Sequence, residues 1–449
     1  MGTFGRRSEI LQPATAPAPA GPSPTPAASR VTEAALSRLR AQVMEQIDPV
    51  VAGRLAGPAL QAQLRALVHD VADRERVEIS GRDELQIAEE LTHDMVGYGP
   101  LEPLLQDDSI SDIMVNGPNR VFVEVRGKVH MTDVKFQSMA QLNAIAQKMA
   151  ATVGRRVDES SPLVDCRLTD GSRVNVVFPP LAIDGACISI RKFAKRKADL
   201  RELAAGGSMS PGVALVLEIA ARSRLNVVIS GGTGSGKTTM MNAMSRLVDH
   251  GERIVTIEDA AELQLQQPHV VRLETRPANL EGKGEINQRD LVKNALRMRP
   301  DRIIVGEVRG AEAFDMLQAM NTGHDGSYCT VHANTTRDAV TRIENMVQMG
   351  QTSLPSRAIR TQIASAVDLI VQVERMRDGG RRVSQVSEVA GLEGDIITMN
   401  EVFTFEYEGE GTDGRIRGRW TSPGMRPGFY DRLEYFGLGE AWMRAVREG

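Results

Sequence analysis

Apolar residues between about positions 32 and 97 recur at helical spacing. They form two runs: Leu36, Leu39, Val43 and Ile47, then Leu60, Leu64, Leu67 and Val71. Repeats of three and four residues mark one face of an α-helix. The stretch "GYGPLEPLL" (97–105) then interrupts the pattern with glycine and proline. We therefore predict a small helical bundle over residues 32–97.

The next hundred residues carry short β-like runs. These are "DIMVNG", "RVFVEVRGKV", "SRVNVVFPP" and "CISIRKF", and one helical segment lies among them near 139–151. Strands mixed with a single helix are typical of a compact α+β domain, which we predict at 98–195. A linker is expected at 196–205, followed by a further domain at 206–449.

This last domain alternates apolar strands with helical segments. Its strand-like runs are "NVVIS" at 226, "RIVTIED" at 253, "RIIVGEVRG" at 302, "YCTVHAN" at 328 and "DLIVQVE" at 368. Strands that alternate with helices predict an α/β fold around a mainly parallel sheet. In such folds the loops at the carboxyl edge of the sheet form the ligand site.

Composition narrows the class of protein. The chain has 449 residues, with 54 lysines and arginines against 58 acidic residues, so its net charge of -4 gives no global basic field for nucleic acid or an acidic membrane. Cys166, Cys187 and Cys329 are isolated and contain no CxxC pair, which argues against a disulfide framework or a zinc site. A reducing cytoplasm fits this cysteine usage.

Two further segments matter for location and order. No stretch approaches the roughly 18 to 20 uninterrupted apolar residues of a membrane-spanning helix, so we expect no transmembrane segment. The stretch "QPATAPAPAGPSPTPAAS" (12–29) is rich in proline and alanine and carries no charge. Such a composition cannot bury a core, and we predict a disordered tail over residues 1–31.

A glycine-rich turn follows the strand at 226. Gly231, Gly236, Lys237 and Thr238 satisfy the pattern G-x-x-x-x-G-K-[ST], in which backbone N–H groups and a helix amino terminus cradle phosphates. We predict that the whole loop binds a nucleotide: Gly231, Gly232, Thr233, Gly234, Ser235, Gly236, Lys237, Thr238 and Thr239. The lysine is expected to reach the β- and γ-phosphates of ATP, and the Thr238 hydroxyl to bind Mg²⁺.

Two acids end neighbouring apolar runs. Glu258 ends "RIVTIE", and Glu307 follows Gly306, which stands where many phosphate-loop ATPases place a metal-binding aspartate. We expect Thr238 to hold Mg²⁺ with help from Glu258 or Glu307, because magnesium keeps several waters. Glu307 is the first candidate to polarise the attacking water and Glu258 the second. The sequence does not separate them, and solvated strand-end acids are the alternative.

His324 and His332 flank the stretch "DGSYCTV". A histidine at a strand end beside the γ-phosphate can sense hydrolysis, so both are candidate catalytic residues. The alternative is a packed or solvated side chain without a role in catalysis.

The motifs, taken in order, resemble a known family. "GGTGSGKTT", "TIEDAAEL" and "VGEVRGAEAFDMLQAMNTGHDGSYCTVHAN" resemble the Walker A, Asp-box, Walker B and His-box series of the type II/type IV secretion ATPase superfamily. "GYGPLEPLLQDDSISDIMVNGPNRVFVE" and "RLTDGSRVNVVFPP" are most similar to the tight-adherence (Tad/Flp) pilus assembly ATPases of the CpaF type. The resemblance covers about residues 30–405.

The resemblance implies a RecA-like core with a C-terminal extension, preceded by a PAS-like α+β domain. It also implies a homo-hexameric motor that hydrolyses ATP with Mg²⁺ to assemble or retract a pilus. The ring would be cytoplasmic and peripheral at the inner membrane, beneath a pilus platform protein.

Individual residues follow from the same resemblance. The Asp-box glutamate falls on Glu258 with Glu262 after it, the Walker B glutamate on Glu307, and the His-box histidine on His332 with His324 upstream. The glycine at 306 is normal for the family. Arginines that stabilise the γ-phosphate match Arg173 and Arg191 best, with Arg272 and Arg276 as alternatives in the core. Gly310 replaces an acid of type II relatives, which favours the Tad or conjugation branch.

Other functions remain open on the sequence. A type IV secretion or conjugation ATPase would carry the same motifs. A nucleic-acid motor would share the ATP site, but it usually needs stacking aromatics, and only 4% of the chain is aromatic. A small-molecule P-loop kinase would not need the preceding domains, and a weakly active scaffold would bind ATP only to assemble.

Overall fold

The computed structural model describes residues 33–47, 55, 57–125, 127–193, 198–276, 278, 283–350 and 353–448. The predicted tail at 1–31 lies outside these residues. The chain divides into two compact units between Pro103 and Leu104. This division falls a little after the predicted boundary at 97, and the two sheets found among the described residues lie in the second unit.

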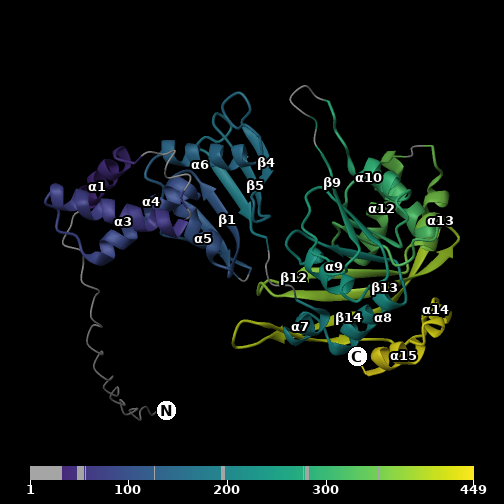
Figure 1. Cartoon of the computed structure of the whole chain (residues 1–449). Helices are drawn as coiled ribbons and strands as arrows, with labels where there is room; N and C mark the ends of the chain where they lie inside the picture. The colour runs from purple at the N-terminus through teal and green to yellow at the C-terminus, as the bar shows by residue number, and fades with distance from the viewer. Residues whose placement is uncertain are drawn as a thin grey trace, which may run out of the picture. The chain divides into compact units, whose positions relative to one another are not determined.

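The first unit is helical, as the apolar spacing predicts. Its elements are α1 (Glu33–Glu45), α3 (Gly57–Arg74) and α4 (Gly81–Val96), which Figure 1 labels, and the 3-10 helix η1 (Gly99–Leu101). Leu39 and Leu60 are among the residues buried where the helices meet. Helix α4 begins at a capping box, in which the Ser80 hydroxyl accepts from the Asp83 N–H and the Asp83 carboxylate accepts from the Ser80 N–H.

Helix α5 (Glu102–Gln106) spans the boundary, and the second unit continues with a six-stranded antiparallel sheet in the order β3-β2-β1-β6-β5-β4. The strands are β1 (Ile110–Asn116), β2 (Val121–Val125), β3 (Lys128–Met131), β4 (Leu163–Arg167), β5 (Arg173–Val177) and β6 (Cys187–Arg191), with helix α6 (Met139–Thr152) between β3 and β4. The single run "RVFVEVRGKV" is two strands, because Gly127 adopts a φ of 79° at the turn. Strand β4 was not predicted.

The core of the second unit is a nine-stranded sheet in the order β15-β14-β13-β12-β7-β11-β10-β8-β9. Its parallel part comprises β7 (Val227–Gly231), β8 (Ile254–Glu258), β9 (Val270–Glu274), β10 (Arg302–Val308), β11 (Tyr328–Val331) and β12 (Leu369–Arg375). Strand β11 therefore lies between the strand that precedes the glycine-rich loop and the strand that carries Glu307. The carboxyl ends of these strands meet at one edge.

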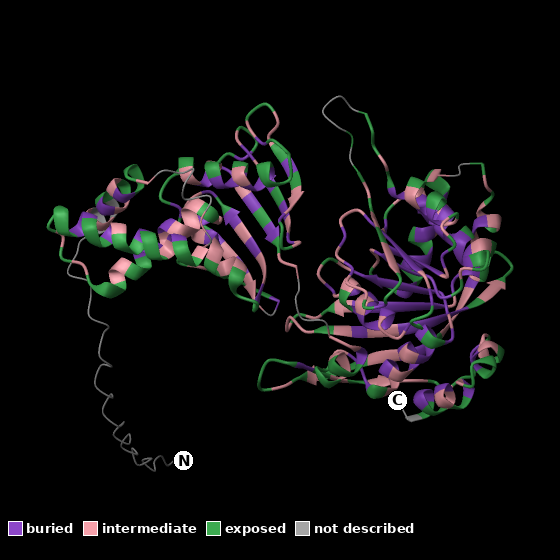
Figure 2. Cartoon of the chain, in the orientation of Figure 1, coloured by how far each residue is buried: buried purple, intermediate pink, exposed green. Residues whose placement is uncertain are grey.

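Helices cover both faces of this sheet (Figure 1). One face packs against α7 (Leu200–Ala205), α8 (Pro211–Arg222), α9 (Lys237–Ser245), α14 (Tyr430–Tyr435) and α15 (Gly439–Glu448), and the other against α10 (Gln288–Ala295), α11 (Glu312–Asn321), α12 (Thr336–Gly350) and α13 (Ser356–Ala366). In β7, Val227 and Ile229 face the first layer and Val228 the second, as the alternation of a strand requires. The central strands are buried along their length (Figure 2).

Two features of this unit differ from the sequence-based expectation. The range 196–205, predicted as a linker, contains helix α7, which starts at a capping box formed by Asp199 and Glu202. The mainly parallel sheet also continues into an antiparallel extension of β13 (Arg381–Glu393), β14 (Ile396–Glu410) and β15 (Ile416–Thr421). No helix among the described residues is long and apolar enough to cross a membrane.

The turn between β12 and β13 is fixed by a carboxylate. Asp378 accepts hydrogen bonds from the Gly380 N–H at 2.9 Å and from the Ile416 N–H at 2.9 Å, and it pairs with Arg382 at 3.2 Å. Burial alone would raise the pKa of Asp378, but the Arg382 guanidinium and the two backbone donors outweigh it and lower the pKa to about 2. The turn is thereby joined to the start of β15.

Polar groups also join the amino ends of the parallel strands. The buried Arg302 at the start of β10 makes two hydrogen bonds to Glu252, at 2.5 and 3.0 Å. Asn226, just before β7, accepts from the N–H groups of Gly326 and Ser327 and donates to two carbonyl oxygens, those of Met320 and Ala366. These contacts connect several strands at the edge opposite the glycine-rich loop.

Candidate active site

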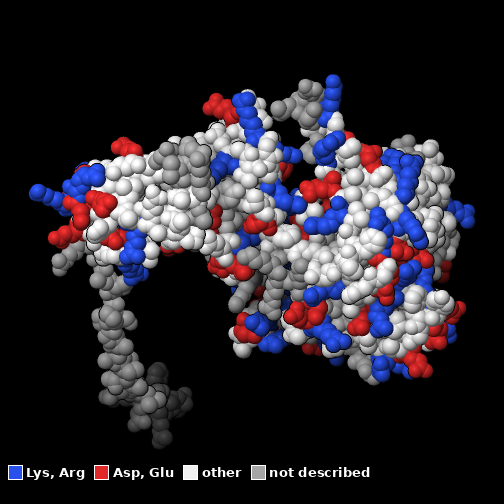
Figure 3. Space-filling view, viewed as in Figure 1, with Lys and Arg blue, Asp and Glu red and all other residues white. Residues whose placement is uncertain are grey.

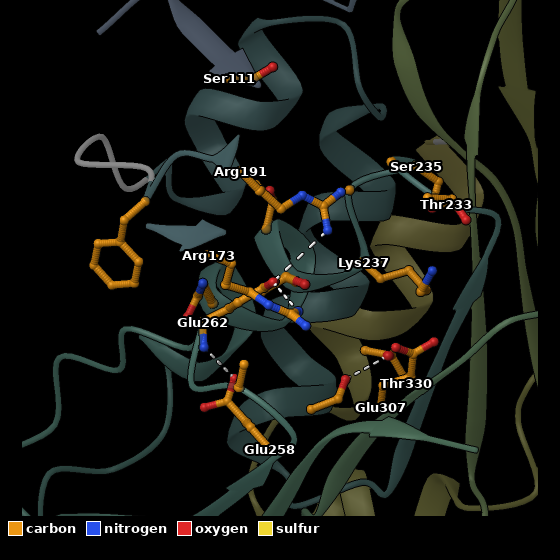
Figure 4. Close-up of a pocket in the computed structure, with 18 of the residues that line it drawn as sticks. Ser111, Arg173, Arg191, Thr233, Ser235, Lys237, Glu258, Glu262, Glu307 and Thr330 are labelled. Carbon is orange, nitrogen blue, oxygen red and sulfur yellow. Dashed lines mark hydrogen bonds and ion pairs between the residues drawn. The ribbon is translucent and has the colours of Figure 1, made fainter. Parts of the chain in front are cut away.

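A cavity of about 430 Å³ lies at the carboxyl edge of the parallel strands. Among the residues that line it are Thr233 to Thr239, Glu258, Glu307, His332, Arg173 and Arg191. Figure 4 shows that the loop, the two acids and the two arginines come from different elements and surround one space. The structure thus brings together most of the residues that the sequence selected.

The glycine-rich loop has the backbone that phosphate binding requires. Gly234 and Gly236 adopt φ values of 68° and 102°, a region that residues with a side chain rarely occupy. A Cβ on Gly231 would lie 2.2 Å from the Val373 carbonyl oxygen, so this position also excludes a side chain. The loop runs directly into helix α9 with Lys237 as its first residue. The helix amino terminus therefore adds its partial positive charge to the cavity.

Lys237 is held inside the loop. Its Nζ donates to the carbonyl oxygens of Gly231 and Gly232, both at 2.9 Å, and lies 3.3 Å from His332 Nε2. Burial lowers the pKa of Lys237, which the carboxylate of Glu307 partly offsets. The ammonium group is thus poorly solvated, and its hydrogen-bond partners among the described residues are two carbonyl oxygens and a histidine nitrogen. Such a cation gains strongly from an incoming phosphate.

Glu307 is the centre of a charged network. Its Oε1 lies 2.9 Å from His332 Nε2, and its Oε2 lies 2.5 Å from an Arg309 amino group. Arg309 also reaches Asp259 at 3.3 Å. Burial and the nearby Lys237 ammonium lower the pKa of His332, which favours the neutral ring. Glu307 is therefore held by His332 and Arg309 at the lining of the cavity.

Glu258 occupies the place next to Gly306. A Cβ on Gly306 would lie 2.8 Å from Glu258 Cγ, because β8 and β10 are neighbours and pair from Ile254 to Ile257. Glu258 Oε2 accepts from the N–H groups of Glu262 and Leu263 at 2.7 and 2.9 Å. Glycine at 306 thus makes room for an acid supplied by the adjacent strand.

The other oxygen of this carboxylate is uncommitted. Glu258 is 3% exposed, and its Oε1 has no hydrogen-bond partner among the described residues. Burial raises the pKa of Glu258, although the two backbone donors lower it. A buried carboxylate oxygen without a partner is costly, so the site is suited to a ligand that supplies a proton or a positive charge.

Two arginines reach the cavity from the six-stranded sheet. Arg173 at the start of β5 pairs with Glu262 at 2.9 Å, and Arg191 at the end of β6 lies 3.9 Å from the same carboxylate. Arg173 and Arg191 are register partners on neighbouring strands, which places both guanidinium groups on one side of the cavity (Figure 4). Glu262 follows the acid Glu258 in the sequence and holds the arginines close to it.

Other predicted residues lie elsewhere. His324 does not line the cavity, and its Nδ1 lies 3.2 Å from the Ala319 carbonyl oxygen. The reason is that His324 precedes β11 and His332 follows it, so the strand carries the two histidines to opposite edges of the sheet. Arg272 and Arg276 also do not line the cavity, and Arg276 Nε donates to the Gly284 carbonyl.

Two lining arginines were not predicted. Arg309 follows Glu307 by two residues, and its position in "GEVRG" was a local signal for a role beside that acid. Arg381 lines the cavity from the start of β13 and donates from Nε to the Gly234 carbonyl at 2.9 Å. Because Arg381 follows the loop by well over a hundred residues, spacing alone could not associate the two.

The lining residues fit a magnesium ion carried by a nucleotide. The described residues contain no cluster of three or more acidic, histidine or cysteine side chains placed to hold a metal. Mg²⁺ bound with a nucleotide takes most of its ligands from phosphates and water. Thr238 and the uncommitted Oε1 of Glu258 both lie at the cavity, so the Thr238 hydroxyl would hold the ion directly and Glu258 through water.

Comparison with known proteins gives consistent matches. The family described as "Type II/IV secretion system protein" matches residues 94–416. A Mycobacterium tuberculosis protein named "Putative conjugal transfer protein" is 41% identical over 312 residues, which cover 68% of this chain and 88% of that protein. The conjugal transfer protein TrbB of Rhizobium radiobacter is 34% identical over 291 residues, covering 64% of this chain and 86% of TrbB.

Solved structures with similar chains include the VirB11 ATPase from the Brucella suis type IV secretion system in complex with sulphate. It is 29% identical, with a TM-score of 0.35, and the match covers 64% of this chain and 95% of that chain. At this TM-score the superposition carries no argument about the arrangement of domains. The sequence matches therefore carry the comparison.

Proposed function

The chain belongs to the type II/IV secretion system protein family, and we propose that it is a motor ATPase that converts ATP hydrolysis into domain movement. The observation that carries this proposal is the single cavity that joins the glycine-rich loop, two acids and arginines of a second sheet. A nucleotide at this place would contact both sheets of the second unit. Hydrolysis would then change the contacts that the nucleotide makes with each of the two sheets.

Binding begins with an exchange of partners at Lys237. Its ammonium group leaves the carbonyl oxygens of Gly231 and Gly232 for the β- and γ-phosphates, which carry formal charge and are stronger acceptors. The N–H groups of the loop and of the first turn of α9 bind the remaining phosphate oxygens. The Thr238 hydroxyl would hold the Mg²⁺ that accompanies the nucleotide, and this ion would supply positive charge to the phosphates.

Glu307 and Glu258 are the two groups that can orient and deprotonate the attacking water. Contacts with His332 and Arg309 orient the Glu307 carboxylate. Two backbone N–H groups orient the Glu258 carboxylate, and its Oε1 has no hydrogen-bond partner among the described residues. We place Glu307 first because its carboxylate contacts His332 Nε2, which lies 3.3 Å from the Lys237 ammonium that would reach the γ-phosphate. Arg173 and Arg191 supply positive charge to that phosphate, a contribution worth roughly 10³ to 10⁵ in rate in related chemistry.

We further propose that the chain works as a homo-hexameric ring, peripheral at the inner membrane, that acts on a platform protein to assemble or retract a tight-adherence pilus. The motifs shared with CpaF-type proteins support this. A second candidate is a type IV secretion or conjugation ATPase, which the conjugal transfer relatives at 34% and 41% identity favour. Lysine, arginine and acidic side chains are interspersed on the visible face (Figure 3), which offers no support for a basic nucleic-acid track there.

The test of the ATPase proposal is Lys237→Ala. We expect no measurable hydrolysis and a large loss of ATP affinity, because no other side chain of the loop carries a positive charge. Lys293→Ala, at an exposed position of α10 in the same domain, is the matched control and should behave as the unmodified chain. Turnover in Lys237→Ala near that of the control would refute the site.

The two cellular roles are separated by the same variant in the native host. If the chain drives a tight-adherence pilus, Lys237→Ala abolishes surface pili and leaves conjugal DNA transfer unchanged. If it belongs to a conjugation system, DNA transfer is lost and pilin still reaches the surface. Lys293→Ala serves again as the control in both assays.

A further inference from the structure

The tip of the phosphate loop is contacted by the hairpin of β12 and β13. Arg381 Nε donates to the Gly234 carbonyl oxygen at 2.9 Å. Arg375, across the same hairpin, places an amino group 3.5 Å from the point that a Cβ on Gly234 would occupy. Two guanidinium groups therefore lie at Gly234 of the glycine-rich loop.

Both arginines also hold a carboxylate of the six-stranded sheet. Glu124 of β2 lies 3.5 Å from Arg375 and 3.7 Å from Arg381 through its two oxygens, and its side chain is 13% exposed. Arg375 additionally donates to the carbonyl oxygen of Gly127, in the turn that follows the same strand. A chain of polar contacts thus runs from the Gly234 carbonyl oxygen through Arg381 to Glu124 of β2.

The charges in this group are unequal. Two guanidinium groups share one carboxylate, and their remaining acceptors are neutral carbonyl oxygens. Arg375 contacts both Glu124 of β2 and the Gly127 carbonyl in the turn after it. Among the described residues of the six-stranded sheet, Arg381 contacts Glu124 alone, at 3.7 Å, and Arg381 also lines the cavity. A nucleoside di- or triphosphate in the loop would bring several negative charges next to Arg381 and would compete with Glu124 for it.

We infer that Arg381 is a further phosphate-binding residue for the nucleotide, that Glu124 holds it when the site is empty, and that Arg375 is a positioning residue that retains Glu124 when Arg381 turns to phosphate. The inference rests on the proposed ATPase function, and it assigns a role to the β12–β13 hairpin that is separate from that of Arg173 and Arg191. Nucleotide binding would then weaken one of the two links between the loop and β2.

Equilibrium affinity of the full chain for ATP, ADP and AMP, measured by fluorescence titration, tests this arrangement. Arg381→Gln should weaken ATP and ADP binding about tenfold, equivalent to about 1.4 kcal/mol, because a charge-assisted contact is lost. AMP binding should change much less, because the Gly234 tip of such loops faces the β-phosphate. Arg381→Lys should retain part of the affinity.

Glu124→Gln is the decisive variant because the predicted effect has the opposite sign. Removing the competing carboxylate should tighten ATP binding several-fold, whereas loss of a merely structural contact would weaken it or leave it unchanged. Arg377→Gln is the matched control: Arg377 lies on the same hairpin but pairs with Tyr407 and Glu410, and its loss should leave all three affinities unaltered.

The outcomes separate this inference from the proposed function. If Lys237→Ala abolishes ATP binding while Arg381→Gln and Glu124→Gln bind ATP as the control does, the hairpin has no role and the ATPase site stands. Weaker ATP binding in Glu124→Gln would also overturn the inference. If Lys237→Ala binds ATP normally, the site itself is wrong, and the inference fails with it.

Discussion

Gly306 offers a sharp test of how the acids are arranged, because its role depends on contact rather than on charge. In Gly306→Ala the new methyl group would lie 2.8 Å from Glu258 Cγ and 3.5 Å from Glu258 Oε2. The first distance is about 1 Å shorter than a comfortable carbon–carbon contact. The φ of Gly306 is not in the left-handed region, so alanine meets no backbone penalty and any effect comes from the contact.

The strain must move Glu258, because the alternative is to displace a buried strand. Glu258 Oε2 is held by two N–H groups at 2.7 and 2.9 Å, and a shift of about 1 Å would break at least one of these bonds. Overpacking of this kind costs about 1 to 3 kcal/mol. A displacement of about 1 Å in a catalytic group can lower turnover by about 10²-fold. We therefore expect turnover to fall by about 10- to 100-fold with ATP affinity within a few-fold of normal.

Steady-state ATPase rate and nucleotide titration are the assays. Gly310→Ala is the control, since its Cβ would meet only the flexible end of Glu312 at 3.3 Å. The double variant Gly306→Ala with Glu258→Asp has a shorter acid and should lose less than the product of the two single effects. Unchanged turnover in Gly306→Ala, with the folded state intact, would refute the idea that Glu258 packs on Gly306 during catalysis.

Three further expectations follow from contacts in the second unit. Glu307→Gln should retain ATP binding and lose about 10² or more in turnover; a mild Glu307→Gln with a severe Glu258→Gln in the same ATPase assay would reverse the two roles. The double variant Arg173→Ala and Arg191→Ala should bind ATP but lose most of its hydrolysis. If the arginines act on the site of a neighbouring chain, mixing this variant with Glu307→Gln subunits should restore some ATPase activity. An ATPase rate that does not change with the mixing ratio would exclude action between chains. Asp378→Asn should lower the free energy of unfolding, measured in urea, by about 2 kcal/mol at pH 7. Because the pKa of Asp378 is lowered to about 2, the difference between the variant and the unmodified chain should shrink as the pH falls from about 4 to about 2. A difference that stays constant with pH would contradict the stabilising role of the Asp378 carboxylate.

The placement of the glycine-rich loop and the two acids at one cavity was predictable because their sequence signals are local. The motif around Lys237 lies between an apolar strand and a helix in one continuous stretch, and the acid Glu307 ends an apolar run. Where the position of a side chain depends on which strands are neighbours in the sheet, the sequence left alternative roles open. The contact between Glu258 and Gly306 depends on β8 lying beside β10, and the only sequence signal for it was the glycine itself.

Residues whose place depends on distant parts of the chain were harder to predict. Arg381 reaches the loop only because β12 pairs with β7 and turns back into β13. The antiparallel strands from β13 onward mix polar and apolar residues without a clear alternation, so their pattern did not indicate a sheet extension. His324 was selected for its nearness in sequence to His332, but the strand between them carries it to the other edge.

The contacts of Arg302 and Asn226 at the amino ends of the parallel strands have a consequence for amide hydrogen exchange. Ile303 donates its N–H to the Ser327 hydroxyl, and the Arg302–Glu252 pair and Asn226 fix the neighbouring backbone. Amides at this edge should exchange only through the largest unfolding events. Those at the opposite edge, beside the cavity, can exchange through small local openings that a bound nucleotide suppresses. Protection within a single strand would therefore record, residue by residue, which end is fixed and which end responds to ligand.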